Sequence, residues 1–187
     1  MNLKVKVGIS NRHVHLTEDI YYKLFDSPLS KKKDLTQIGE FAANEMVKIE
    51  TSKKTFDNVR IIGPFRKYNQ VEISRSDARI LGINPPVRKS GDLENSEKIK
   101  ITTPKGSVVL DNCCIISERH IHMSLDDAKY YGVSDEQIVK VLINGDKSCI
   151  LYAHIKVSDN GILAFHIDID DANAAGLQND DEVEIII

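Results

Sequence analysis

The chain has 187 residues, 41% hydrophobic and 28% charged, a composition typical of globular proteins and not of disordered chains. Its 25 Lys and Arg against 28 Asp and Glu give a net charge of -3, which offers no general attraction for nucleic acid. The apolar runs, such as 108–110 and 185–187, fall far short of the roughly 20 residues that a membrane helix needs. We therefore expect neither nucleic acid nor a membrane as a partner.

The first ten residues, MNLKVKVGIS, alternate between apolar and polar and so predict a β-strand. They have neither the apolar core nor the cleavage site of a signal peptide, which favours a cytoplasmic enzyme. Three cysteines are too few for a disulfide framework and fit a reducing compartment. Cys113 and Cys114 lie in the apolar stretch DNCCIIS, which predicts buried strand thiols, while a catalytic role for Cys113 or Cys149 stays an alternative.

An internal repeat follows along the chain. The segments RHVHLTEDIYYKLF, from Arg12, and RHIHMSLDDAKYYG, from Arg119, share the pattern R-H-[VI]-H. A second pair, EISRSDARILG from Glu72 and HIDIDDANAAG from His166, aligns without gaps. The segment that follows His122 has the same Asp, Ala and Gly spacing as this second pair. We interpret the repeat as a duplication of one strand-to-helix unit.

Each unit predicts a strand that hands over to a helix of about two turns. Two residues after each leading His or Glu stands a good N-cap, namely Thr17, Ser74, Ser124 or Asp168. In three of the units an Asp follows three positions later, as in a capping box, and a glycine suited to a left-handed C-terminal position ends the helix at Gly82, Gly132 or Gly176.

The repeat also predicts two metal sites. Residues i and i+2 of a strand point to the same side, so each His-x-His pair can bind one ion, and the second unit of each half supplies a third ligand. The two predicted triads are His13, His15 and Glu72, and His120, His122 and His166. Three protein ligands leave an open position typical of catalytic zinc, and imidazole favours zinc over cobalt, nickel or iron. His154 lies outside the pattern and is expected to be an ordinary strand residue.

The remaining chain predicts many short strands, which suggests two small antiparallel β-barrels capped by short α-helices. The polar stretch VRKSGDLENSEK, residues 87–98, is expected to be the loop that joins the two halves. A Gly-Pro turn places Arg66 and Lys67 close in sequence to Glu72. The planar guanidinium of Arg66 suits a phosphate at this point, because it binds oxyanions with two parallel hydrogen bonds.

Four stretches together carry a family resemblance: GISNRHVHL, NVRIIGPFRKYNQVEISRSDARILGINPPVRKSGDL, ISERHIHMSLDDAKYYGV and FHIDIDDANAAG. They resemble the PduL-type phosphate acyltransferases, also called phosphate propanoyltransferases, over nearly the whole chain. The resemblance implies interconversion of a short-chain acyl-CoA and phosphate with acyl phosphate and CoA, where the acyl group is acetyl or propanoyl. It implies two zinc ions per chain on the triads above, phosphate binding by Arg66, and contacts to coenzyme A, as a substrate, from Ser10, Arg60 and Asn173.

The resemblance also implies an architecture. It predicts a mainly β protein of two duplicated barrels with helical caps, in which the N-terminal strand crosses into the C-terminal barrel. The expected domains are residues 12–117, and residues 1–11 together with 118–187. A homodimer is expected as well. Members that enter bacterial microcompartments carry an N-terminal extension, so a chain that starts at the first strand is expected to be cytoplasmic unless such an extension was removed.

Two other functions stay open at this level. A dinuclear zinc hydrolase of esters or thioesters would use a metal-bound hydroxide, although it usually needs a bridging carboxylate that the repeat does not offer. A metal-stabilised binding or scaffold module would favour closed sites of four ligands, whereas this chain offers three for each site.

Overall fold

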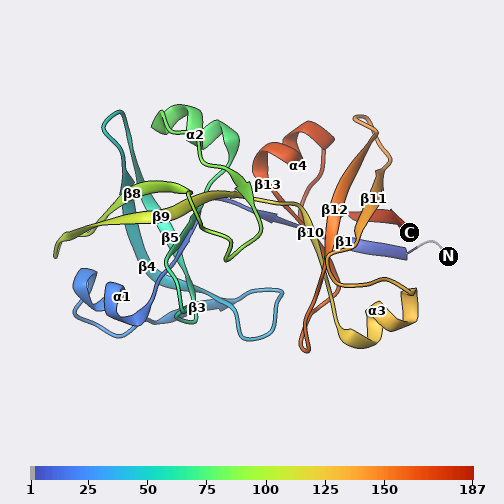
Figure 1. Cartoon of the computed structure of the whole chain (residues 1–187), viewed down its shortest axis with the longest axis horizontal. Coiled ribbons are helices and arrows are strands. Elements are labelled where there is room, and N and C mark those ends of the chain that lie inside the picture. Colours follow the sequence, from blue (N-terminus) through green and yellow to red (C-terminus); the bar gives the residue numbers. More distant parts are fainter. Residues whose placement is uncertain (1–2) are drawn as a thin grey trace. The chain divides into compact units, whose positions relative to one another are not determined.

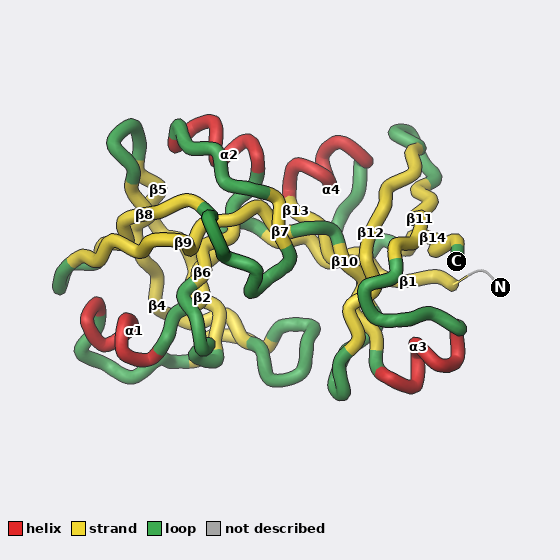
Figure 2. The backbone as a smooth tube through the Cα atoms, in the orientation of Figure 1, coloured by secondary structure: helices red, strands yellow, loops and turns green. Residues whose placement is uncertain are grey.

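The computed structural model describes residues 3–187, which form four short helices and fourteen strands. The strands are β1 (Leu3–Ser10), β2 (His13–His15), β3 (Lys31–Asp34), β4 (Phe41–Glu50), β5 (Thr55–Gly63), β6 (Gln70–Glu72), β7 (Val87–Arg88), β8 (Glu97–Thr102), β9 (Ser107–Ser117), β10 (His120–Met123), β11 (Ile138–Ile143), β12 (Cys149–Val157), β13 (Ala164–Asp168) and β14 (Glu182–Ile186). The helices are α1 (Glu18–Leu24), α2 (Arg75–Leu81), α3 (Leu125–Tyr131) and α4 (Ile169–Ala175), drawn in red in Figure 2.

The described chain divides into two compact units, each built on one barrel. One unit, here called the first barrel, comprises residues 11–35 and 39–117. The other, the second barrel, comprises residues 3–10, 36–38 and 118–187. The predicted fold, a mainly β protein of two barrels with short helical caps, is confirmed. Whether each unit is an independent domain, with the boundaries expected above, stays a prediction.

The first barrel closes through six strands in the order β4-β5-β2-β6-β9-β8, because β8 pairs with both β9 and β4. The strands β3 and β7 extend it at β4 and β9. The polar stretch 87–98 lies inside this barrel, since it contains β7 and the first two residues of β8. A division of the halves at that loop is therefore wrong, because no repeated motif marks the two strands that close the barrel.

The second barrel closes in the order β1-β13-β10-β12-β11-β14. Leu3, Val5 and Val7 of β1 are buried while Lys4 and Lys6 are exposed, which is the alternation that predicted this strand. In Figure 1, β1 in dark blue lies beside the red β14, and it pairs in parallel with β13 and antiparallel with β14. The predicted crossing of the N-terminal strand into the C-terminal barrel is confirmed.

Both barrels are mixed, not purely antiparallel as the strand pattern suggested. β2 runs parallel to β5 and β6 parallel to β9, and β10 runs parallel to β12 in the second barrel. Each barrel has its own apolar core, made of the inward residues of its strands and the buried faces of its helices. Cys113 and Cys114 belong to the first core and are 1% and 0% exposed, which confirms the prediction of buried strand thiols.

The predicted helix ends are largely as the repeat indicates. Ser74 and Ser124 form full capping boxes, and α2, α3 and α4 each end at a glycine with φ between 68° and 69°. Thr17 is the exception, because its side chain makes no cap bond although it occupies the N-cap position. Its hydroxyl donates instead to the side-chain oxygen of Asn69, so the cap is replaced by a bond to a neighbouring loop.

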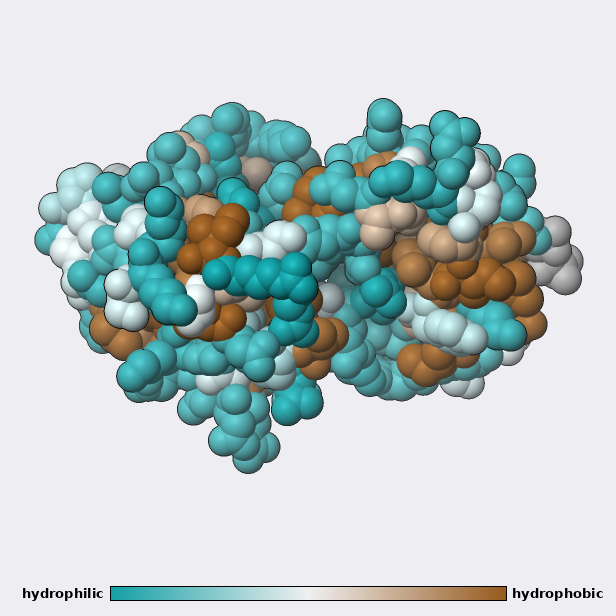
Figure 3. Space-filling view, turned by 90° about the horizontal axis from the view of Figure 1, so that it is seen from above, coloured by the Kyte–Doolittle hydropathy of each residue, from teal (hydrophilic) through white to brown (hydrophobic). Residues whose placement is uncertain are grey.

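Two surface features bear on the expected partners. No helix within residues 3–187 is both long and apolar enough to cross a membrane. Hydrophobic residues gather on the visible face of the second barrel, at the right of Figure 3. The exposed apolar side chains on β11, β12 and β14 include Ile138, Ile150, Tyr152 and Ile186. The expected homodimer stays a prediction.

Candidate metal centres

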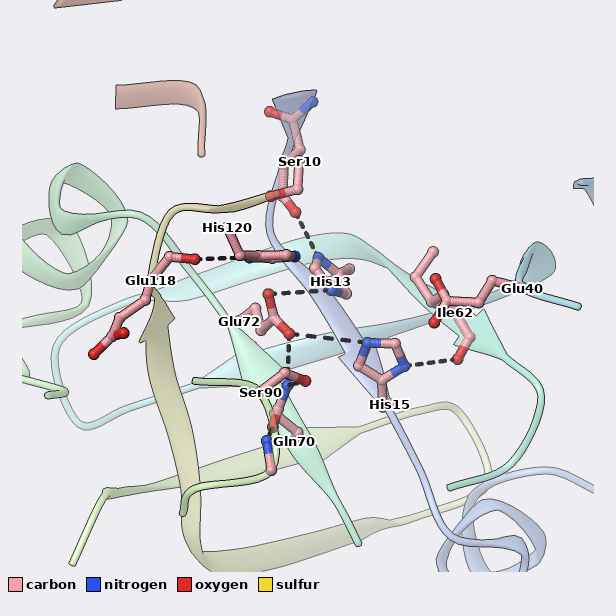
Figure 4. A network of polar contacts seen from close by, with 12 residues as sticks. Ser10, His13, His15, Glu40, Ile62, Gln70, Glu72, Ser90, Glu118 and His120 are labelled. Carbon is pink, nitrogen blue, oxygen red and sulfur yellow. Dashed lines mark hydrogen bonds and ion pairs between the residues drawn. The ribbon is translucent and has the colours of Figure 1, made fainter. Parts of the chain in front are cut away.

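The first cluster lies on two neighbouring strands of the first barrel. β2 and β6 pair antiparallel, with His13 opposite Glu72 and His15 opposite Gln70. His13 Nε2 lies 3.6 Å from one carboxylate oxygen of Glu72, and His15 Nε2 lies 4.0 Å from the other. One ligand atom from each of these three residues lies within 4.8 Å of the other two, and Figure 4 shows the side chains converging.

The second cluster repeats this arrangement in the second barrel. β10 and β13 pair antiparallel, with His120 opposite His166 and His122 opposite Ala164. The Nε2 atoms of His120 and His122 are 3.2 Å apart, and the three ligand atoms again lie within 4.8 Å of one another. The repeated residues therefore occupy equivalent positions of the strand pairs β2–β6 and β10–β13. In each barrel the three predicted ligands lie close together.

Backbone carbonyls fix the orientation of three imidazoles. The Nδ1–H of His13 donates to the carbonyl of Asn11 at 2.8 Å, and that of His120 donates to the carbonyl of Glu118, also at 2.8 Å. His15 uses Nδ1 in the same way toward Ile62, at 3.2 Å. Because a carbonyl only accepts, each ring carries a proton on Nδ1, which leaves Nε2 as the atom that faces its cluster and can bind a metal ion.

Burial favours the neutral form, which a metal ligand requires, in His15 and His122. Burial, together with the neighbouring His13, lowers the pKa of His15 to about 3. Burial and the charge of His120 lower the pKa of His122 to about 2. Burial by itself would lower the pKa of His13, but the charge of Glu72 and the hydrogen bond to it prevail and raise it. Glu72 therefore attracts positive charge to the first cluster.

This donor set fits a zinc-type ion. Each cluster offers three ligands from side chains that converge, and Nδ1 hydrogen bonds direct the Nε2 atoms of His13, His15 and His120 toward the two centres. The two sets differ in charge, because the first contains a carboxylate and the second contains only imidazole. We do not find a fourth His, Cys, Asp or Glu joined to either group in residues 3–187, so each cluster would keep a coordination position for substrate or water.

Arg66 is held at the first barrel by an ion pair. Its Nη2 contacts a carboxylate oxygen of Glu40, and its backbone N–H donates to the carbonyl of Leu16, 2.9 Å away. Its positive charge contributes to the lowered pKa of His15, which places the guanidinium within electrostatic range of the first cluster. Glu40 accepts from one nitrogen of the guanidinium, which carries five N–H donors in all.

The three residues expected to contact coenzyme A lie on three different elements, β5, β1 and α4. Arg60 lies opposite His13 on β5 and donates to the carbonyls of Ala43 and Asn44. Ser10 ends β1, opposite Asp168, and its hydroxyl donates to the carbonyl of Ile167 at 3.4 Å. Asn173 is exposed on α4. These placements leave the expected contacts with coenzyme A as predictions.

Sequence reasoning missed several polar neighbours of the clusters. Gln70 is fully buried beside Glu72, and strand alternation could have indicated it, because the two residues are two apart. His154 is buried opposite His120, with its ring stacked on that of His120 and its Nδ1 3.5 Å from a carboxylate oxygen of Glu118. The expectation of an ordinary strand residue was thus incomplete. Glu40 carried no repeat signal at all.

The fold and its clusters define a class, namely two-barrel β proteins with a duplicated candidate metal centre. The sequence profile of the family described as phosphate propanoyltransferase matches residues 6–178. The chain belongs to this phosphate propanoyltransferase family, and its membership supports phosphate acyltransferase activity.

Curated relatives agree with this assignment. The chain is 48% identical over 184 residues to a phosphate propanoyltransferase of Thermotoga maritima, covering 96% of this chain and 88% of the relative. It is 47% identical to one of Lachnoclostridium phytofermentans, covering 91% and 82% of the two chains. It is 43% identical to one of Salmonella typhimurium, covering 94% and 85%.

Proposed function

We propose that this chain is a zinc-dependent phosphate acyltransferase that interconverts a short-chain acyl-CoA and phosphate with acyl phosphate and CoA. The observation that carries the proposal is the convergence of three ligand atoms in each barrel, at equivalent ladder positions, in a member of this family. The acyl group is propanoyl or acetyl, a difference of one methylene that an apolar pocket distinguishes by roughly 1 to 3 kcal/mol.

The residues that would hold the two zinc ions are the two triads: His13, His15 and Glu72 in the first barrel, and His120, His122 and His166 in the second. Bound zinc would supply Lewis-acid stabilisation of the negative charge that develops on the reacting oxygen and sulfur. The chain contributes preoriented imidazoles, because Nδ1 of His13, His15 and His120 is already committed to backbone carbonyls.

Arg66 is proposed to bind phosphate. Its side chain is 27% exposed and is held by the ion pair with Glu40, so part of the entropic cost of ordering it is already met before an anion binds. It would orient one phosphate oxygen toward the thioester carbonyl carbon and neutralise part of the phosphate charge. Ser10, Arg60 and Asn173 are proposed to contact coenzyme A.

The reaction needs no acyl-enzyme. A phosphate oxygen forms a bond to the thioester carbon, the bond from that carbon to sulfur breaks with its electron pair going to sulfur, and the phosphate proton ends on the CoA thiol. The buried cysteines fit this scheme, because burial raises the pKa of Cys113 to about 12 and raises that of Cys114 well above its usual value. Neither is a thiolate nucleophile at neutral pH. A cytoplasmic homodimer completes the proposal.

The experiment is a CoA-release assay on protein of known zinc content, with acetyl-CoA and propanoyl-CoA, in the presence and absence of phosphate. Release that requires phosphate, with acyl phosphate as the product, supports the proposal. Release at the same rate without phosphate contradicts it and favours the zinc hydrolase. Zinc binding with no turnover of either substrate favours the scaffold module.

A further inference from the structure

The first cluster is part of a square of four side chains on one face of the β2–β6 ladder. His13 and Glu72 form one opposed pair, and His15 and Gln70 form the other. Side chains two apart on a strand point the same way, so Gln70 shares a face with the three ligands. The equivalent square of the second barrel contains Ala164 at this corner, opposite His122. The duplicated sites thus differ at the fourth position.

Gln70 uses its whole amide group within the site. Its Nε2 donates to Oε1 of Glu72 at 2.5 Å and to the hydroxyl of Ser90 at 2.8 Å, while its Oε1 accepts from the backbone N–H of Gly91 at 2.8 Å. The side chain is 0% exposed. These contacts fix which amide atom is nitrogen, because a backbone N–H must meet an oxygen. Figure 4 shows Gln70 and Ser90 beside Glu72.

The amide donor has a specific effect on the carboxylate. The bond to Oε1 restrains the rotation of the Glu72 side chain and directs its other oxygen, Oε2, toward His13 Nε2 at 3.6 Å. Glutamate loses considerable side-chain freedom when it is fixed, and an outer partner that fixes it beforehand lowers the cost of binding an ion. Imidazoles have fewer rotatable bonds, which is consistent with alanine at the equivalent corner of the all-histidine cluster.

We infer that Gln70 is a positioning residue that preorients the Glu72 carboxylate for the metal ion of the first cluster and anchors the turn at residues 89–91 beside it. This inference rests on the proposed function only in that the first cluster binds a metal. The metal affinity of the first centre would then depend on the side-chain amide of Gln70, which does not itself bind the metal. The equivalent corner of the second centre is Ala164, which has no side-chain amide to offer.

The test measures zinc affinity of the first cluster alone. In a background with His122→Ala and His166→Ala, zinc is titrated against a chromophoric chelator in the full chain. Gln70→Met keeps most of the volume but removes the donor. It should weaken zinc binding by about 10- to 100-fold, the usual effect of losing an outer partner. Ser90→Ala, which frees the amide on one side, should weaken it less.

The matched control is Gln37→Met. Gln37 is also a buried glutamine. Its side-chain amide donates to the carbonyl of Ile162 and accepts from the N–H of the same residue, and neither bond involves a ligand of the first cluster. The Gln37→Met substitution should therefore leave the zinc affinity of the first cluster unchanged. The cobalt-substituted protein gives a second readout, because its visible spectrum reports ligand geometry and should change for Gln70→Met and not for Gln37→Met.

Each result decides the matter. Unchanged affinity and spectrum in Gln70→Met, or equal losses in Gln70→Met and Gln37→Met, overturn the positioning role. If Gln70→Met does not fold, Ser90→Ala alone decides, and wild-type affinity in that variant overturns the inference. A background protein that binds no zinc with Gln70 intact contradicts the proposed function instead, so the two failures are distinct.

Discussion

Arg12 forms a two-pronged ion pair with Asp77, with its Nη2 2.6 Å from Oδ1 and its Nε 3.0 Å from Oδ2. Arg119 does the same to Asp171, at 2.7 and 2.8 Å. In each barrel the arginine directly precedes the first histidine ligand, and the aspartate lies in the first turn of the helix that follows the third ligand. The pair therefore ties together the two segments that carry one metal cluster.

The first prediction concerns this tie. A double-mutant cycle with Arg12→Ala and Asp77→Ala should give a coupling energy of about 1 to 3 kcal/mol in urea unfolding, because the pair is bidentate and Asp77 is buried. The pair of Lys48 and Asp57, exposed at both ends, should show no measurable coupling and serves as the control. Equal coupling in the two pairs would contradict the structural role.

The second prediction concerns the glycine behind His166. Gly8 pairs with His166 in the β1–β13 ladder, and a Cβ added there would lie 2.8 Å from the imidazole Cδ2. Gly8→Ala should displace the ring and remove about one zinc per chain, leaving the first cluster loaded. Gly106→Ala meets no atom closer than 3.9 Å and should keep both ions. Elemental analysis of the two variants checks this, and two tightly held ions in Gly8→Ala would contradict it.

The third prediction concerns the cysteines. Burial raises the pKa of Cys113 to about 12, so at pH 8 this thiol stays protonated and unreactive, and Cys114 behaves alike. Iodoacetamide should label only Cys149, which is partly exposed, until denaturant exposes the other two. Peptide mapping by mass spectrometry measures the sites. The singly labelled enzyme should keep its activity, and inactivation in step with labelling would point to a catalytic thiol.

The fourth prediction concerns Arg66. Arg66→Ala should lower kcat/KM for phosphate by about 10²- to 10³-fold, the usual effect of losing a donor to developing charge, with zinc content unchanged. Lys67→Ala is the matched control, since this neighbour is exposed and has the same charge. Initial rates at varied phosphate separate the two variants. Similar modest losses in both would mean that general positive charge, and not the guanidinium of Arg66, binds phosphate.

Much of the candidate site can be predicted from the sequence, because its ligands belong to short motifs that occur twice in the chain. The i, i+2 spacing of His13 and His15 fixes their common direction, and the alignment of Glu72 with His166 identifies third ligands that lie far along the chain. The serine caps and terminal glycines are equally local signals. The buried alternation of β1 predicts a strand, but its place in the second barrel came only with the family resemblance.

The remaining features depend on tertiary contacts that no local pattern encodes. Glu40 reaches Arg66 from a segment outside the repeat, and Thr17 exchanges its cap for Asn69 because a loop brings that amide close. Gln70 has no counterpart in the second barrel, so a search for repeated residues passes over it. The closure of the first barrel by β8 depends on pairing with both β4 and β9, which strand propensity does not specify.

The most direct test of the two-centre account is the zinc content of purified chain, measured beside Glu72→Ala and His166→Ala variants that remain folded by circular dichroism. The account predicts two ions in the unaltered chain and one in each variant, with phosphate-dependent CoA release lost in both. Two ions retained in either variant, or full activity after both ions are removed by a chelator, would contradict it.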